Sequence, residues 1–174
     1  ENIQLTMMGK NYEIVQAKRL TTNGVKLVLM AGTIKDTLRE GSTQIYTIND
    51  IDYKITADYI DANSAKFTVN GELTRDMLVG ETDKISNGLT IGVSDIYYED
   101  SAGGVRQATF FLGSDKLELR DSDITDSASS NELKVNDETI DGAHVKIQGS
   151  INEPSPLKST EIKTIGVNMI ADDA

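Results

Sequence analysis

Three aspartates in a polar segment are the candidate metal ligands of this chain. Asp121, Asp123 and Asp126 follow an Asp-x-Asp-x-x-Asp spacing within residues 120–132, a stretch with almost no apolar side chain. Ca²⁺ binds several carboxylate and carbonyl oxygens, often supplied by one loop, so these side chains could bind Ca²⁺. The spacing differs from the EF-hand pattern, which needs a Gly at the sixth position and a Glu at the twelfth. A solvated linker without a metal is the alternative that the composition favours.

His144 is the only histidine, and its position does not favour catalysis. The alternation of Val145 and Ile147 predicts a strand with these side chains on its inner face and His144 on its exposed face. A Ser-His-Asp triad also needs an exposed serine at a sharp turn, and the sequence has no Gly-x-Ser-x-Gly motif. We therefore expect His144 to have no catalytic role.

Acidic residues are numerous, but no two of them stand out as an acid and a base. The chain has 28 Asp and Glu residues against 17 Lys and Arg residues. The carboxylates that could act in acid–base hydrolysis are Asp61, Glu72, Glu99 and Asp100. Cysteine is absent, and Gly103-Gly104 falls in an expected hairpin tip instead of a phosphate-binding loop. These observations predict that the protein is not an enzyme and uses no cofactor, unless the aspartate segment binds Ca²⁺.

The net charge of −11 also restricts the partners that the chain can have. Binding to nucleic acid without sequence preference requires a basic face, and an acidic protein is repelled by anionic lipid. No apolar run in the sequence is long enough to span a membrane. We therefore expect neither nucleic acid nor a membrane span, and we expect the acidic residues to serve solubility or tolerance of salt.

The apolar pattern predicts strands along most of the chain. Period-two alternation places apolar side chains on one face at three sites: Ile51, Tyr53 and Ile55; Leu89, Ile91 and Val93; and Ile165, Val167 and Met169. Turn dipeptides such as Asn49-Asp50 and Asn70-Gly71 separate the strands. Only residues 33–41 and 73–80 could hold a short turn of helix. The sequence predicts an all-β fold in which antiparallel hairpin and meander sheets form a barrel- or sandwich-like domain.

An internal repeat accompanies this pattern. Residues 12–29 and 53–69 share a Tyr-x-Ile start and an Asn-led tip, and residues 87–113 form a looser third copy. Each copy predicts a β-hairpin with a polar tip, which either a duplication or ordinary hairpin chemistry would produce. We expect a repeat-built β domain over residues 1–120, a polar linker over residues 121–132, and a C-terminal β segment over residues 133–174 that packs on or pairs with the first domain.

The N-terminal segment could take part in assembly. Ile3, Leu5 and Met7 alternate with polar residues, which predicts an extended strand with one apolar face. Such a strand can complete the sheet of a neighbouring copy by strand addition. The alternative is that it pairs within its own sheet.

Residues 8–17, with the sequence Met-Gly-Lys-Asn-Tyr-Glu-Ile-Val-Gln-Ala, resemble the Gly-Lys-x-Tyr-x-Ile-Val-x-Ala opening of archaeal surface-layer proteins of the methanococcal type. The segments that follow, residues 38–41, 51–69 and 87–96, are similar too, so the resemblance covers about the first two thirds of the chain. Those proteins are usually much longer, and this chain has no Asn-x-Ser/Thr glycosylation site of the kind they often carry.

The resemblance implies a secreted structural protein of the cell envelope. We expect a subunit or domain of an archaeal surface layer or extracellular filament that self-assembles with copies of itself through strand edges and termini. The alternative is an extracellular adhesion module that binds a glycan or another surface, with Tyr97 and Tyr98 at a loop end as the contact.

Overall fold

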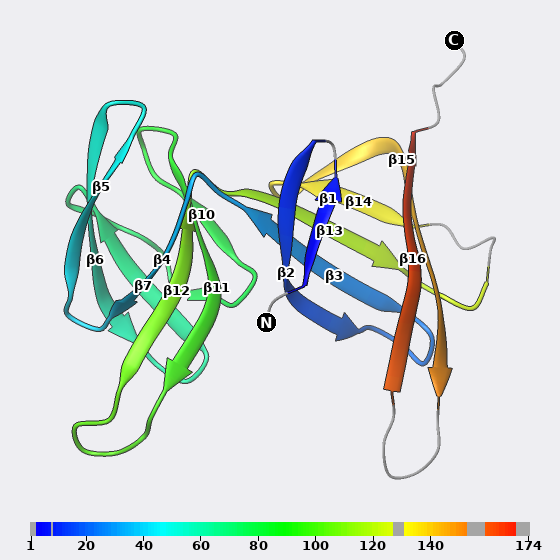
Figure 1. Cartoon of the computed structure of the whole chain (residues 1–174), viewed down its shortest axis with the longest axis horizontal. Coiled ribbons are helices and arrows are strands. Elements are labelled where there is room, and N and C mark those ends of the chain that lie inside the picture. The colour runs from blue at the N-terminus through cyan, green and yellow to red at the C-terminus, as the bar shows by residue number, and fades with distance from the viewer. Residues whose placement is uncertain (1–2, 8, 127–130, 153–158, 170–174) are drawn as a thin grey trace. The chain divides into compact units, whose positions relative to one another are not determined.

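The computed structural model describes residues 3–7, 9–126, 131–152 and 159–169, and this part of the chain contains sixteen β-strands and no helix (Figure 1). The all-β prediction is therefore confirmed. The strands are β1 (Gln4–Met7), β2 (Lys10–Arg19), β3 (Val25–Ala31), β4 (Ile34–Arg39), β5 (Thr43–Ile48), β6 (Ile51–Ile60), β7 (Ser64–Val69), β8 (Glu72–Leu73), β9 (Met77–Leu78), β10 (Thr82–Lys84), β11 (Thr90–Tyr98), β12 (Arg106–Leu112), β13 (Asp115–Asp121), β14 (Glu132–Val135), β15 (Glu138–Asn152) and β16 (Ser159–Met169).

The strands form three sheets built from antiparallel hairpins. A seven-stranded sheet has the order β1-β2-β3-β13-β14-β15-β16, and a four-stranded sheet has the order β10-β11-β12-β4. The third sheet has the order β5-β6-β7-β8, and β9 pairs separately with β7. Most neighbours are consecutive in sequence, but β3 neighbours β13 and β12 neighbours β4, so two long-range pairings organise the chain.

The chain divides into two compact units, the first made of Glu1–Val15 with Leu29–Asp115 and the second of Gln16–Val28 with Lys116–Ala174. This division differs from the boundaries expected at residues 120 and 133. The expected boundaries follow the order of strands along the chain, whereas a sheet groups strands by pairing. Here β3 pairs with β13, which follows it at a long distance in the sequence.

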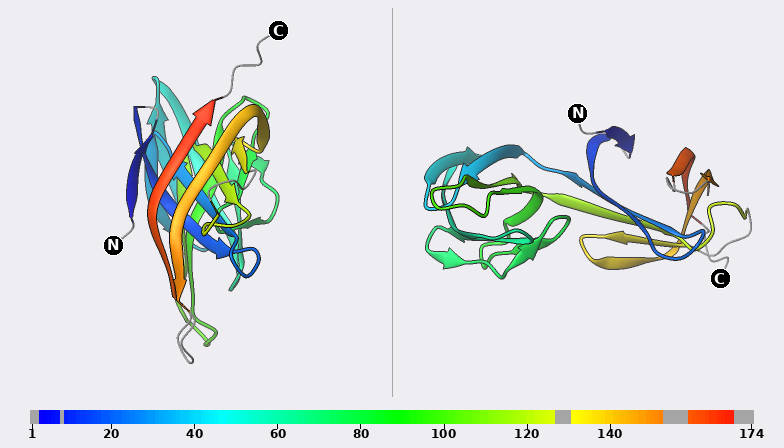
Figure 2. Two further views of the ribbon diagram at one scale, coloured as in Figure 1. Left: turned by 90° about the vertical axis from the view of Figure 1, so that its right-hand side faces the viewer. Right: turned by 90° about the horizontal axis from the view of Figure 1, so that it is seen from below.

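In the first unit, the four-stranded and five-stranded sheets lie face to face as a sandwich (Figures 1 and 2). Apolar side chains from both sheets fill the space between them, and the ring centroids of Phe67 and Phe110 lie 5.1 Å apart. Fully buried members of this core are Ile55, Ala57, Ile60, Phe67, Met77, Ile91, Val93, Phe110 and Leu112. The period-two alternation therefore places one apolar face of each sheet in a common core.

Each predicted repeat copy covers a hairpin: β2-β3, β6-β7 or β11-β12. The strand before each hairpin (β1, β5 or β10) lies outside the predicted copy and pairs with the first strand of the hairpin, so a three-stranded meander results each time. Backbone hydrogen bonds close the tips of two copies. The Leu20 amide donates to the Gly24 carbonyl in the first copy, and the Asp61 amide donates to the Ser64 carbonyl in the second. The first bond joins residues four positions apart and the second joins residues three positions apart, so the two tips differ in length by one residue.

The chain enters and leaves the sandwich at one place. Ile34 at the start of β4 is directly opposite Leu112 at the end of β12, and the Thr33 amide donates to the Leu112 carbonyl at 2.9 Å. Gly32 lies so close to Phe111 and Leu112 that a Cβ atom would come within 3.0 Å of both residues. A glycine is therefore needed where the two strand ends run side by side.

The second unit contains β13 to β16 and the adjoining parts of β2 and β3. β15 and β16 form a long curved hairpin (Figure 2), and the apolar face of the unit holds Val25, Leu27, Leu117, Leu119, Leu133, Val145 and Ile147, all buried. Ile124 adds a buried side chain from the loop after β13. That loop is held on both sides, because the Ile124 amide donates to the Asn23 carbonyl and the Ile124 carbonyl accepts from the Gly149 amide.

Both helical turns that the sequence allowed are absent. Residues 33–41 contain β4, which pairs with β12, and residues 73–80 contain the end of β8 together with β9, which pairs with β7. Short segments with mixed apolar spacing take the conformation of the strand they can pair with, so tertiary pairing decides here over local propensity.

Candidate assembly edge

The outermost strand β16 presents the longest open edge of the seven-stranded sheet. It pairs with β15 on one side, with Ala143 opposite Met169 at one end and Asn152 opposite Ser159 at the other. Among the described residues, no strand pairs with its other side. An edge strand of eleven residues offers unpaired backbone N–H and C=O groups, which can accept a strand from another chain.

The apolar face of the sheet continues onto β16 but is covered less there. Val145 and Ile147 on β15 are buried, whereas their partners Val167 and Ile165 are only half-buried. Met169, opposite the buried Ala143, is 65 % exposed. The apolar face therefore ends in a partly exposed row on β16, and an added strand could cover it.

The N-terminal candidates Ile3, Leu5 and Met7 lie in or next to the other outermost strand, β1, which pairs antiparallel with β2 of the same chain. Leu5 is opposite the buried Tyr12, and the Ile14 amide donates to the Ile3 carbonyl at 2.9 Å. Ile3 is 66 % exposed, while Leu5 and Met7 are half-buried. The structure thus shows the alternative in which this segment pairs within its own sheet. Donation of β1 to a neighbour remains a prediction.

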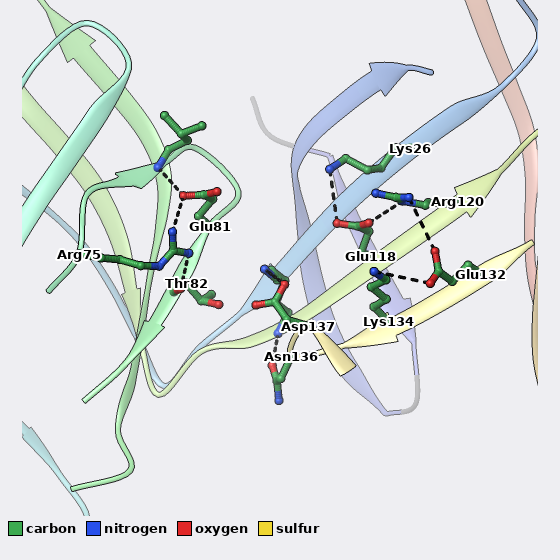
Figure 3. Close-up of polar contacts among 12 residues, drawn as sticks. Lys26, Arg75, Glu81, Thr82, Glu118, Arg120, Glu132, Lys134, Asn136 and Asp137 are labelled. Carbon is green, nitrogen blue, oxygen red and sulfur yellow. Dashed lines mark hydrogen bonds and ion pairs between the residues drawn. The ribbon is translucent and has the colours of Figure 1, made fainter. Parts of the chain in front are cut away.

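Ion pairs join the polar side chains of the three central strands in the second unit. A chain of contacts runs from Lys26 on β3 through Glu118 and Arg120 on β13 to Glu132 and Lys134 on β14 (Figure 3), with nitrogen–oxygen distances between 2.7 and 3.8 Å. Glu118 is buried and accepts from both Lys26 and Arg120. Such cross-strand charge pairs fix the register of the sheet that carries β15 and β16.

The three aspartates proposed as metal ligands are not brought together. Asp121 is fully buried, and its carboxylate accepts the amides of Ile147 at 2.7 Å and Asp123 at 3.0 Å. No group of three or more potential ligands that could hold a metal occurs among the residues that the structure describes. These aspartates act as hydrogen-bond acceptors that order the loop, and Asp126 continues the turn by donating its amide to the Asp123 carbonyl.

The Asp123 carboxylate has a similar structural role. It accepts the Thr125 hydroxyl at 2.6 Å, the Asn23 amide group at 3.1 Å and the Thr125 backbone amide at 2.9 Å. These hydrogen bonds, of which that from the Thr125 hydroxyl contributes most, lower the pKa of Asp123 below its usual value. Within the segment expected to be a linker, residues 122–126 therefore form a structured loop, and residues 127–130 lie outside the described residues.

The remaining carboxylates also accept local hydrogen bonds. Asp61 accepts the amides of Asn63 and Ser64 at the tip between β6 and β7, which lowers its pKa. Glu72 accepts the amide of Ser86, and Glu99 accepts the Tyr97 hydroxyl at 2.6 Å. These structural roles cannot be recognised from the sequence, because the carboxylates differ only in which hydrogen-bond donors the fold brings near them.

His144 and the two tyrosines lie at the surface or near it. His144 is exposed and is opposite Glu132 on β14 and Asn168 on β16. Tyr97 is 49 % exposed, and the ring of Tyr98 has the Arg106 guanidinium 5.0 Å from its centroid. The exposed Tyr97 at the end of β11 is compatible with a contact surface. No helix in the described residues is long and apolar enough to cross a membrane.

The N-terminal strand was expected to mediate assembly, and β16 was not recognised as a candidate. The signal was available in the alternation of Ile165, Val167 and Met169, but an edge position cannot be recognised without knowing which strand is paired last. Comparison of the chain with models of protein families, with curated proteins and with solved structures finds no match.

Proposed function

We propose that the chain is a non-enzymatic structural module of a cell-surface layer or extracellular filament, and that copies associate through the open edge of β16. One observation carries this proposal: an eleven-residue edge strand whose apolar row is only partly covered. Natural edge strands are often short or covered by other elements, so that sheets do not join. A long uncovered edge fits a protein whose role is to join its neighbours.

The polar side chains of β16 are compatible with such pairing. Glu161 and Lys163 carry opposite charges on the same strand, and both are exposed. Opposite charges across a strand pair stabilise it, and like charges in direct opposition disfavour the wrong register. The resemblance to archaeal surface-layer proteins of the methanococcal type supports an extracellular location in the cell envelope.

Proline substitution can test the edge without removing the strand. Consecutive backbone N–H groups of a regular strand point to opposite sides, so one of two neighbouring prolines breaks pairing with β15 and the other blocks only the open edge. Two neighbouring pairs suit this design, Thr160→Pro with Glu161→Pro and Asn168→Pro with Met169→Pro. In each pair, the variant whose thermal unfolding stays close to that of the parent protein identifies the outward N–H.

The two fold-preserving prolines are then combined and compared with the parent protein by electron microscopy and sedimentation velocity. We expect long assemblies from the parent and monomers from the combined variant. Assembly of the combined variant to the same extent as the parent would rule out the β16 edge. Absence of assembly in the parent at millimolar concentration would reject the proposed function.

A further inference from the structure

The loop between β11 and β12 and the turn after β4 enclose a pocket in the first unit. Its volume is about 350 Å³, which lies within the range of about 300 to 1,000 Å³ that is typical of small-molecule sites. The lining residues are Arg39, Glu40, Ser101, Gly103, Gly104, Val105 and Arg106. The lining therefore combines two cations, one carboxylate, a hydroxyl and an apolar side chain.

Arg106 is held in a defined orientation at this pocket. Its Nη1 atom lies 3.3 Å from Glu40 Oε2, and its guanidinium stacks on the ring of Tyr98. Glu40 is fixed in turn, because its Oε1 atom accepts the amide of Ile60 at 2.9 Å. A guanidinium has five N–H donors, so the contact with Glu40 leaves donors for a ligand.

Arg39 provides the second cation. It is exposed, and within the described part of the chain no acceptor contacts its guanidinium. This is notable in a chain of net charge −11, in which most described arginines, such as Arg75 and Arg120, contact a carboxylate. Arginine binds a planar carboxylate through paired hydrogen bonds, so an unpartnered arginine in a pocket lining favours an anionic ligand.

The loop before Arg106, which forms part of the pocket lining, is fixed by its own hydrogen bonds. The Gly104 amide donates to the Ser101 carbonyl at 2.8 Å, and the Val105 amide donates to the Glu99 carboxylate at 3.0 Å. Gly104 packs directly against the Glu99 backbone, where a Cβ atom would clash. The loop therefore presents the Ser101 hydroxyl and the Val105 side chain on a preformed surface.

We propose that this pocket binds an acidic sugar residue, a hexuronate, through its carboxylate. Arg39 and Arg106 donate to the carboxylate, Glu40 and Ser101 bind ring hydroxyls, and Val105 contacts the apolar face of the ring. Glu40 makes the site unfavourable for a compact dianion such as phosphate, whereas a hydroxyl-rich monoanion can use the same carboxylate as an acceptor. This binding is independent of assembly through β16.

Titration of the ¹⁵N-labelled full chain with sodium glucuronate tests the proposal. We expect saturable shifts of the Ser101, Gly103, Gly104 and Val105 amide signals. Glucose, sodium acetate and sodium phosphate at the same ionic strength should produce much smaller shifts. Equal shifts with glucose would show that the carboxylate of the ligand is not recognised. Equal shifts with acetate would show that the sugar ring is not recognised. Stronger shifts with phosphate would contradict the proposal that the ligand is a hexuronate.

Substitutions then locate the contact. Arg39→Ala should weaken glucuronate binding about tenfold, as expected for the loss of one charge-assisted hydrogen bond, and Arg39→Lys should restore part of it. Lys18→Ala removes one exposed positive charge from the second unit and is the matched control, so its affinity should be unchanged. Unaltered binding by Arg39→Ala, or equal weakening in both alanine variants, would contradict the proposal.

Discussion

The sandwich of the first unit and the curved sheet of the second bury their apolar faces to different degrees. In the sandwich, two sheets cover each other, so Ile55, Phe67 and Phe110 have no exposed surface. In the second unit, Val145 and Ile147 on β15 are buried, whereas the apolar row opposite them on β16 is only half-buried. The comparison shows that the same period-two pattern can produce a closed core or an unfinished one, depending on whether a second layer or further strand covers the last apolar row.

Truncation of one isoleucine in each region to alanine should reveal the largest difference between them, measured as the loss in free energy of unfolding. Ile55→Ala removes a fully buried side chain and should lower the free energy of unfolding by about 4 kcal/mol, through lost burial and a cavity. Ile165→Ala makes the same chemical change on the half-buried row of β16 and should cost about 1 kcal/mol.

Urea unfolding at a concentration where the chain is monomeric measures both values. A cost for Ile165→Ala as large as that for Ile55→Ala would mean that the row on β16 is already fully covered within one chain. Repeating the measurement under conditions where the chain assembles sharpens the comparison. Assembly should cover the row on β16 and so increase the loss in free energy of unfolding for Ile165→Ala but not for Ile55→Ala.

The second unit contains a fully buried carboxylate, whereas the buried polar side chains of the sandwich are hydroxyls. Asp121→Ala should leave the buried amide of Ile147 without its acceptor and release the loop over residues 122–126, lowering the free energy of unfolding by about 3 kcal/mol. Asp58→Ala, at an exposed position on β6, is the control and should change stability by less than about 0.5 kcal/mol.

Chemical denaturation in the presence of a chelator should give the same result as denaturation without one, because the carboxylate bonds to N–H groups. Stabilisation of the parent protein by added Ca²⁺, lost in Asp121→Ala, would show instead that the aspartate segment binds the metal.

A smaller effect is expected inside the β15–β16 hairpin. At Gly149, next to the bulge, a Cβ atom would collide with the backbone carbonyl of Glu161, so Gly149→Ala should destabilise by about 2 kcal/mol. At Gly166, the nearest atom to a Cβ is the Lys146 carbonyl oxygen at 3.9 Å, so Gly166→Ala should be almost neutral. Thermal unfolding of the two variants provides the test, and equal midpoints would argue against this close approach.

Period-two alternation was sufficient to predict the fold class and most strands. It predicted β6 from Ile51, Tyr53 and Ile55, because a half-buried strand leaves that pattern regardless of its partner. It could not predict β4, where Leu38 is the only buried side chain and pairing with β12 supplies the rest of the stabilisation. Local patterns indicate strands, but the pairing of distant strands decides the sheets and units.

The candidate sites were harder to predict than the fold. Asp121 was chosen as a metal ligand because of its spacing, yet its burial and its bond to Ile147 depend on a strand that follows 26 residues later. The pocket at Arg39 and Arg106 joins segments from two hairpins, which no linear motif marks. Residue type restricts what a side chain can do, while the fold decides what it contacts.

The meeting of Ile34 and Leu112 has a consequence for how such a chain could change over time. Everything between these residues begins and ends at one point, so the whole sandwich resembles a cassette inserted into a single connection. A segment with adjacent ends can be gained, lost or exchanged with little disturbance to the strands on either side of it. Variants of this architecture could therefore carry a different inserted domain between the same two strands, β3 and β13, of the seven-stranded sheet.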